Sequence, residues 1–473
     1  MVGLFIRGDE RYRFLGGNPF SLTSGSQQWH EQHGAELARP RITYTTHVDD
    51  VYDEVQSDGN EAGSQGYVRH LEFLLPLSQS ALRPVIGFSM TSSDFSSRFR
   101  LPSSEQADFK NGLTAIAIDY RMRLNRLLQI GGMLGHSSNG GKTQWNYRSE
   151  FVLRPGSNVS LLVQVSDRAS WQVLDLDINN VNGNLPLEFQ QRAARLSVIY
   201  SSRTFTISST ALHSLISSLP DEGRLAEAHF HPEGDIDDLS VQTVYAMTEK
   251  WQGVLAVEWR ALKAAGSFVF GGARYGMLRE IQYDDILIQI GSQYHLSGQW
   301  LLLMDAQWRR LRGAAYGYAE SWPFISVFDS PVSSRENFIA RGSAEFWKLH
   351  VGAAMPVTSN LTLGFGANYV HLIPELLLSS WESRVLVFGA RGYQERTLPV
   401  RSIDLGIVSG GFQAELAGII AEYSFVQFVP VAALRKPDDP GETTTTGPPS
   451  AVPSVASRTS GGQFHRLSIA YEF

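Results

Sequence analysis

The sequence predicts an all-β protein: a single transmembrane antiparallel β-barrel of about 16 to 18 strands. Three observations lead to this prediction. Apolar and polar residues alternate in many runs of about ten residues, and very short turns join these runs in pairs. No run approaches the roughly 20 apolar residues that a membrane-spanning helix needs. The composition, with 43% hydrophobic residues and 43 glycines in a chain of 473 residues, fits a closed β-structure.

Residues 143–168 show the repeated hairpin most clearly. Trp145 and Tyr147 share one face of the first strand, and Arg148 and Glu150 share the other. A short Pro-Gly-Ser-Asn turn follows, after which the alternation resumes. Six other segments have the same layout, so the sequence predicts at least seven hairpins.

An eighth, weaker hairpin is expected at residues 399–428, with its turn near Gly410 and Gly411. An opening strand at 41–48 and a closing strand at 464–473 complete the set. These elements give about 18 strands, or about 16 if the eighth hairpin is misread.

The connections between hairpins are mostly about 15 to 35 residues long, whereas the turns within hairpins have about two to five. In a soluble domain, so many long structureless loops would be unusual. A membrane barrel has this asymmetry, with short periplasmic turns and long extracellular loops. The alternative is a soluble sandwich or propeller, but no repeating blade motif is present.

A sheet of this size is expected to close, because open twisted sheets rarely exceed about ten strands. Closure leaves an interior too wide for side chains to fill, and the face opposite the apolar one carries mixed charges that favour water. Aromatic residues at the strand ends, such as Trp145, Trp259 and Trp308, are expected to form two interfacial girdles. The residues expected to line the lumen are Arg121, Arg123, Arg148, Glu150, Glu258, Arg260, Asp285, Asp305, Arg309 and Arg466.

The last strand has apolar or aromatic residues at Leu467, Ile469, Tyr471 and the terminal Phe473. This pattern resembles the carboxy-terminal signal of bacterial outer-membrane β-barrels. The resemblance implies that this strand is recognised by the barrel-insertion machinery, and it covers the chain from about residue 40 onward. His465 departs from the pattern, which prefers an apolar residue there. No particular porin or transporter family is matched.

Two regions are therefore expected: the barrel at 39–473, and residues 1–38, which would form a periplasmic cap, a short plug or a disordered leader. The first ten residues lack the basic start, apolar region and cleavage site of a signal peptide. We interpret the chain as a mature or truncated form of a protein of the outer membrane of a diderm bacterium.

Several classes of function are disfavoured by composition. The chain has no cysteine, which excludes disulfides, thiolate catalysis and cysteine-type zinc sites. Its net charge is −7 and it has no basic run, so nucleic acid is not an expected partner. No cofactor is expected. A weak metal site is conceivable in an external loop at 229–238, whose candidate ligands are His229, His231, Glu233 and Asp235.

The expected function is passage of small solutes through a charged, water-filled lumen, with the outer-membrane lipid and the assembly machinery as partners. One alternative is a structural or secretion-partner barrel. A barrel enzyme acting on lipid is a weaker alternative, because His371 would face the lipid but no motif joins it to a nucleophile. The chain is therefore not expected to be an enzyme.

Deleting Phe473 should impair insertion of the barrel more than transport by the molecules that do insert, because its ring belongs to the expected assembly signal. The measurement is the fraction of heat-modifiable, membrane-inserted protein, compared with solute flux per inserted molecule. Unchanged assembly would contradict the assignment.

Overall fold

The computed structural model describes residues 39–55, 60–77, 84–100, 106–139, 142–178, 181–218, 229–270, 274–296, 300–321, 334–384, 391–398, 403–430 and 458–472. Every regular element in these ranges is a β-strand. None of these ranges contains a helix long and apolar enough to cross a membrane. The expected N-terminal region, residues 1–38, lies outside the described residues, as does Phe473.

The strands vary in length and follow one another along the whole described chain. Their bounds are β1 Arg41–Val55, β2 Asn60–Pro76, β3 Val85–Arg100, β4 Gln106–Arg123, β5 Leu128–Asn139, β6 Lys142–Leu153, β7 Val159–Ile178, β8 Val181–Ser201, β9 Phe205–Ser218, β10 His229–Ala246, β11 Trp251–Phe270, β12 Arg274–His295, β13 Leu301–Ser321, β14 Ser334–Thr358, β15 Leu361–Arg384, β16 Arg391–Leu398, β17 Ile403–Leu416, β18 Ile419–Pro430 and β19 Arg458–Glu472.

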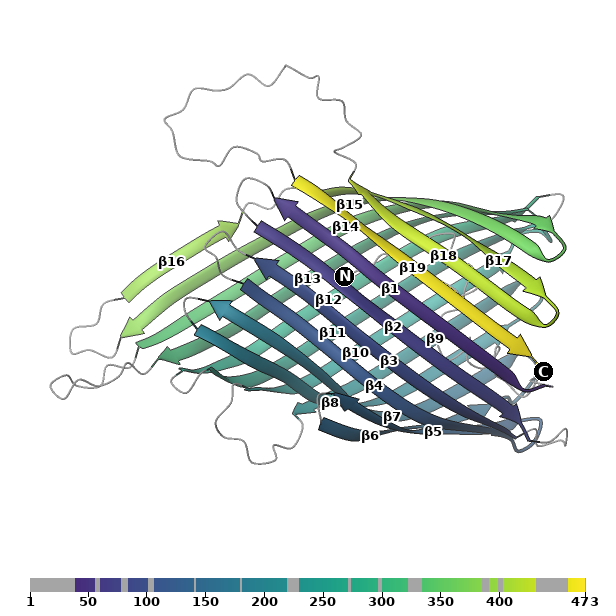
Figure 1. Ribbon diagram of the computed structural model, residues 1–473, viewed down its shortest axis with the longest axis horizontal. Coiled ribbons are helices and arrows are strands. Elements are labelled where there is room, and N and C mark those ends of the chain that lie inside the picture. Colours follow the sequence, from purple (N-terminus) through teal and green to yellow (C-terminus); the bar gives the residue numbers. More distant parts are fainter. Residues whose placement is uncertain are drawn as a thin grey trace, which may run out of the picture.

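The strands form one closed antiparallel sheet, because β1 pairs with β2 on one side and with β19 on the other (Figure 1). β16 pairs with the outer part of β15, at residues 376–383, whereas the inner part of β15 pairs with β17. The cylinder itself therefore has 18 strands. This confirms the predicted fold class and the larger of the two predicted strand numbers.

The turn of the eighth hairpin lies elsewhere than predicted. β17 runs through Gly410 and Gly411, and the chain turns at Ala417 and Gly418, with φ of 51° and 81°. Positive φ at both central residues gives a two-residue turn whose twist matches that of the strands. Gly410 has a different role: a Cβ there would lie 2.8 Å from Cε1 of Phe425, so the glycine leaves room for that ring.

The strands are longer than the predicted runs of about ten residues. β14 has 25 residues and β15 has 24, so much of the sequence assigned to long connections, such as 168–191 and 311–337, is strand. In these outer parts the two faces are not distinguished by polarity, as in the three successive leucines Leu376 to Leu378 of β15, so alternation disappears. The backbone ladder does not require alternation, and it continues. Sequence periodicity therefore detected only the segment with one apolar face.

The outward face of the cylinder carries large apolar side chains with high exposure. Ile118, Trp145, Ile290 and Phe365 are 56%, 64%, 61% and 60% exposed. Such a continuous apolar surface is not stable in water, and lipid is the solvent that suits it. The predicted lipid face is therefore the outward face.

Aromatic pairs mark the two boundaries of this apolar belt. Near the short turns, Trp251 lies directly across from Tyr294. Farther from these turns along the strands, Trp308 lies across from Trp347, and the centroids of these two rings are 6.4 Å apart. Trp251 and Trp259 on β11 are separated by about 26 Å along the strand, or about 20 Å of membrane depth at a tilt of about 40°. This depth approaches the roughly 25 Å apolar band of outer-membrane barrels.

The inward face holds the buried core. Near the short turns it includes the apolar residues Leu74, Val85, Val152 and Leu303, which are at most 4% exposed, beside polar ones such as Arg121, which lies across from Val85. The charged groups of this face are described below. The short turns and the end of β19 lie at the right in Figure 1.

Adjacent residues of β3 test this assignment of faces. Met90 faces outward beside Leu71 and Ile116, whereas Ser89 faces inward opposite Glu72. Met90→Arg should destabilise the barrel by about 2 to 4 kcal/mol, because it places a charge in the lipid. Ser89→Arg is the matched control and should cost far less, since it faces Glu72. Urea unfolding in lipid vesicles, followed by the gel shift of unboiled samples, measures both. Equal losses would contradict the assignment.

Candidate functional site in the barrel lumen

The residues predicted to line the lumen lie on the inward face. Neighbouring residues show this parity: Arg121 is 5% exposed and the adjacent Tyr120 is 50% exposed. Arg309 is likewise buried between outward-facing neighbours. Six of the ten are at most 8% exposed, and these are Arg121, Glu150, Asp285, Asp305, Arg309 and Arg466.

A first charged group, the β4–β6 cluster, consists of Asp119, Arg121, Arg148 and Glu150. Arg148 Nη2 donates to Asp119 Oδ1 at 3.0 Å, although these residues belong to strands separated by β5. Gly131 on β5 lies between Arg121 and Glu150 in the ladder. A Cβ at Gly131 would lie 2.8 Å from Glu150 Oε1. The glycine therefore lets the Glu150 side chain lie over β5, and the four charges form one compensated group.

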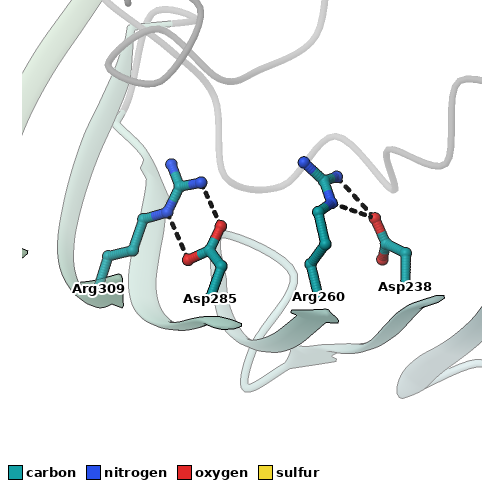
Figure 2. A network of polar contacts seen from close by, with 4 residues as sticks. All are labelled: Asp238, Arg260, Asp285 and Arg309. Atoms are coloured by element: carbon teal, nitrogen blue, oxygen red, sulfur yellow. Dashed lines mark hydrogen bonds and ion pairs between the residues drawn. The ribbon is translucent and has the colours of Figure 1, made fainter. Parts of the chain in front are cut away.

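A second group, the β10–β13 row, consists of two arginine–aspartate pairs whose side chains project from the same side of the sheet (Figure 2). Arg260 donates to Asp238 Oδ2 through Nη2 at 2.6 Å and through Nε at 3.1 Å. Arg309 binds Asp285 with both Nε, at 2.7 Å, and Nη2. The guanidinium of Arg309 also lies 5.7 Å from the ring centroid of Phe346. Two-point contacts of this kind fix the orientation of each arginine.

A third group surrounds Asp305 on β13. Gln289 Nε2 donates to its Oδ1 at 3.2 Å, and His350 Nδ1 lies 2.5 Å from its Oδ2. Lys348, two residues before His350 on β14, is only 1% exposed. Each carboxylate oxygen of Asp305 therefore has a partner in the sheet, and its charge is compensated locally.

The remaining predicted residues lie apart from these groups. Arg123 ends β4, and its Nε donates to the backbone oxygen of Asn125 in the adjacent turn at 3.3 Å, so it belongs to the rim. Arg466 lies on β19, across from Ser424. Glu258 lies on β11, two residues from Arg260.

Several members of these groups were not predicted from the sequence. Asp238 was assigned to an external loop, and His350, Lys348 and Gln289 were not selected. Alternation places a residue on the inward face, but it gives no information about which strands are neighbours or how far a side chain reaches. The alternation of polar Lys348 and His350 with apolar Trp347 and Leu349 on β14 was the available signal.

The segment 229–238 is the beginning of strand β10, and the prediction of an external loop there was wrong. The side chains of His229 and His231 lie outside the described part of the structure. Glu233 is exposed, and Asp235 lies opposite Lys263 in the ladder. Among the side chains that are described, no three histidine or acidic residues are close enough to hold a metal ion.

The described part of the predicted assembly signal faces outward. Ile469 and Tyr471 are 40% and 39% exposed, and they lie opposite Tyr44 and Ile42 of β1, while Leu467 is half-buried on the same face. His465 keeps its place on this face through Tyr423, whose hydroxyl lies 2.8 Å from His465 Nδ1. The two rings stack with centroids 6.1 Å apart.

No family model and no curated protein matches the chain. Solved structures of similar extent were found at low similarity. OccAB3 of Acinetobacter baumannii is 10% identical, covers 92% of this chain and 99% of its own, and has a TM-score of 0.38. The CymD monoaromatic hydrocarbon channel is 10% identical, covers 99% and 98%, and has a TM-score of 0.37. OmpT, an outer membrane protein of Vibrio cholerae, is 10% identical, covers 92% and 100%, and has a TM-score of 0.31.

These matches superpose poorly and carry no assignment of function. The closed antiparallel cylinder, the apolar outer belt between aromatic girdles and the charged interior are observations of the chain itself. The fold is that of a bacterial outer-membrane β-barrel. This barrel has its polar groups concentrated on the inner wall, which is where any solute in the lumen would meet them.

The two pairs of the β10–β13 row differ in burial, and this difference gives a prediction. The side chains of Arg309 and Asp285 are 9% and 8% exposed, and those of Arg260 and Asp238 are 47% and 19% exposed. Asp285→Asn should cost about 3 to 5 kcal/mol, because it leaves a buried arginine without its counter-charge. Asp238→Asn is the matched control and should cost less than about 1 kcal/mol, since water solvates Arg260. Urea unfolding in vesicles measures both changes. Equal effects would show that the inner wall is uniformly hydrated.

Proposed function

We propose that this barrel is a channel or transporter in the outer membrane of a diderm bacterium, and that it passes small solutes through its lumen. The observation that carries the proposal is the distribution of charge. Compensated acidic and basic groups line the inside of a cylinder whose outside is apolar. A barrel that served only as an anchor would have no need for a wall of this kind.

The arrangement of the charges suits selection among solutes. Arginine and carboxylate side chains lie next to one another on the wall. Each cluster of charges is therefore nearly neutral as a whole, but it produces a strong local electric field. Such a field acts on the dipole and charge of a solute that passes close to the wall. The net charge of the lumen contributes less, since the pairs compensate one another within a few ångströms.

The first alternative is a structural or secretion-partner barrel. It would have the same lipid belt, the same partners in the membrane and an occluded lumen. Ion conductance separates it from a channel, because only an open lumen carries current. We propose that the lipid of the outer membrane surrounds the belt and that β19 is the strand read by the assembly machinery.

The second alternative, a barrel enzyme acting on lipid, draws on a polar group on the outer face. His371 Nδ1 lies 2.7 Å from Asp404 Oδ1, and the Tyr369 hydroxyl donates to the same oxygen at 2.5 Å. An aspartate that orients a histidine is part of a hydrolytic site. A nucleophile is also needed, and no serine or threonine in the described part of the chain hydrogen-bonds His371. We therefore retain the channel as the proposed function.

Residues 1–38 belong to the proposal as a cap or plug. The first strand begins at Arg41, which pairs with Glu472 at the end of the barrel where the short turns lie. We propose that the preceding segment lies at or within that opening.

The β4–β6 cluster gives a test with opposite signs. Glu150→Gln leaves its two arginines in excess and should raise the preference for anions, whereas Arg121→Gln leaves the two acids in excess and should raise the preference for cations. Planar-bilayer recording in a salt gradient measures the reversal potential of each variant. The expected shifts are opposite in direction, so each variant controls for nonspecific damage in the other. Absence of current at any voltage would overturn the open-channel proposal.

A further inference from the structure

One sector of the inner wall differs from the charged groups described above. On β14, β15, β17 and β18, four inward-facing residues form a buried apolar cluster: Phe346, Val370, Ile407 and Val426, which are 1% to 5% exposed. Leu372 and Leu405 pack against it. We call this group the apolar sector. It interrupts the polar wall about midway along the strands.

Two polar side chains border the apolar sector on the side toward the short turns. Asn368 pairs with Ile407 in the ladder, and Ser409 pairs with Val426. Both are buried, at 5% and 4% exposure. Within the described part of the chain, no hydrogen-bond partner reaches Asn368 Oδ1, Asn368 Nδ2 or Ser409 Oγ. Buried polar atoms without partners cost free energy, and they are the groups most readily satisfied by a ligand.

The wall next to Asn368 and Ser409 has little side-chain bulk. Gly366 lies across from Ser409, and Gly411 and Gly364 are directly paired on the same two strands. A stretch of wall without side chains permits close approach to the backbone and to the two polar groups. The glycines alone would not define a site, but the unpartnered amide and hydroxyl groups give the position its chemistry.

The neighbouring charges limit what kind of group can bind there. His350 lies across from Asn368 and is held by Asp305, which also lies close enough to the buried Lys348 to interact electrostatically. These charges compensate one another, so no uncompensated charge is available to attract an ion. An amide and a hydroxyl, each able to donate and accept, instead suit an uncharged group that does the same.

From this juxtaposition we infer a solute-binding subsite for an uncharged amphiphile, in which an alkyl or aromatic body lies on the apolar sector and a hydroxyl group bonds to Asn368 and Ser409. The inference rests on the proposed channel function and names the class of solute it takes. The apolar body gains from leaving water, and the hydroxyl satisfies the amide and the serine. A purely apolar solute would leave these polar atoms unsatisfied, and a charged solute would lose its hydration without gaining a counter-charge.

The test uses the full chain in lipid nanodiscs and follows 4-fluorobenzyl alcohol by ¹⁹F NMR. Empty nanodiscs of the same lipid correct for partitioning into the bilayer. Asn368→Leu should weaken binding about tenfold, the value expected for the loss of two ordinary hydrogen bonds. Ser409→Ala should weaken it by about threefold, for the loss of one. Binding of 4-fluorotoluene, which lacks the hydroxyl, should not weaken in either variant, because no hydrogen bond is lost.

Asn146→Leu is the matched control. Asn146 also faces the lumen, but on β6, and its Nδ2 already donates to Ser137 Oγ at 2.7 Å. This variant should bind 4-fluorobenzyl alcohol as the unmodified protein does. Correct folding of each variant is established by the gel shift of unboiled protein.

The outcomes separate this inference from the proposed function. If the protein conducts ions but binds 4-fluorobenzyl alcohol no better than empty nanodiscs do, the subsite is wrong and the channel remains. Equal binding by Asn368→Leu and the unmodified protein would also overturn the subsite. If the alcohol binds in the predicted order of variants but no current is carried, the subsite stands and the open channel fails.

Discussion

The structure depends on the pairing of its first and last strands. Inside lipid every backbone N–H and C=O group needs a protein partner, and a sheet meets this requirement only if it has no edge. β1 and β19 pair over 15 residues, from Arg41 opposite Glu472 to Val55 opposite Arg458. Without this seam, two long strands would present unpaired backbone to lipid, and the energetic cost would exceed any gain from side chains. The alternation of faces, the apolar belt and the polar lumen are all consequences of closure, because closure gives every strand one inside and one outside.

Closure also explains why the inner charges are paired across strands. A side chain on a strand is flanked by the strands on either side, so an ion pair forms most directly with a neighbouring strand, as between Asp238 and Arg260. The pair of Asp119 and Arg148 spans β5, where Met133 lies between the two residues in the ladder. Gly131, two residues away on the same face of β5, leaves the space that the side chain of Glu150 occupies. Gly131 on the inner wall therefore makes room for a charged side chain, in the same way that Gly410 on the outer wall makes room for an aromatic ring.

The fold was predictable from sequence because its strongest constraint is periodic. Apolar and polar residues alternate wherever one face meets lipid, and the short turns have clear sequence signals. The features that were not predicted lie where the sequence has no periodicity. Beyond the belt apolar and polar residues no longer alternate, as in Leu376 to Leu378, so the start of β14 and the outer half of β15 were taken for loops. The turn at Ala417 and Gly418 was missed because the glycine pair at 410–411 gave a stronger local signal. The ten lumen residues could be predicted from the face of the strand on which each lies. Their partners His350 and Lys348 could not, because the sequence does not show which strands are neighbours in the closed sheet.

The inner wall is divided into sectors with different physical properties, and this division bears on selectivity. The β4–β6 cluster and the β10–β13 row present compensated charges, whereas the wall formed by β14, β15, β17 and β18 presents the apolar sector bordered by Asn368 and Ser409. A field that arises from compensated pairs weakens steeply with distance, so it acts mainly on solutes that pass close to the charged wall. An apolar surface acts only on direct contact. A solute with one polar end and an apolar body can satisfy both walls in succession, which ions and hydrocarbons cannot do. Selection by such a lumen would therefore depend on how polarity is distributed within the solute, more than on its net charge.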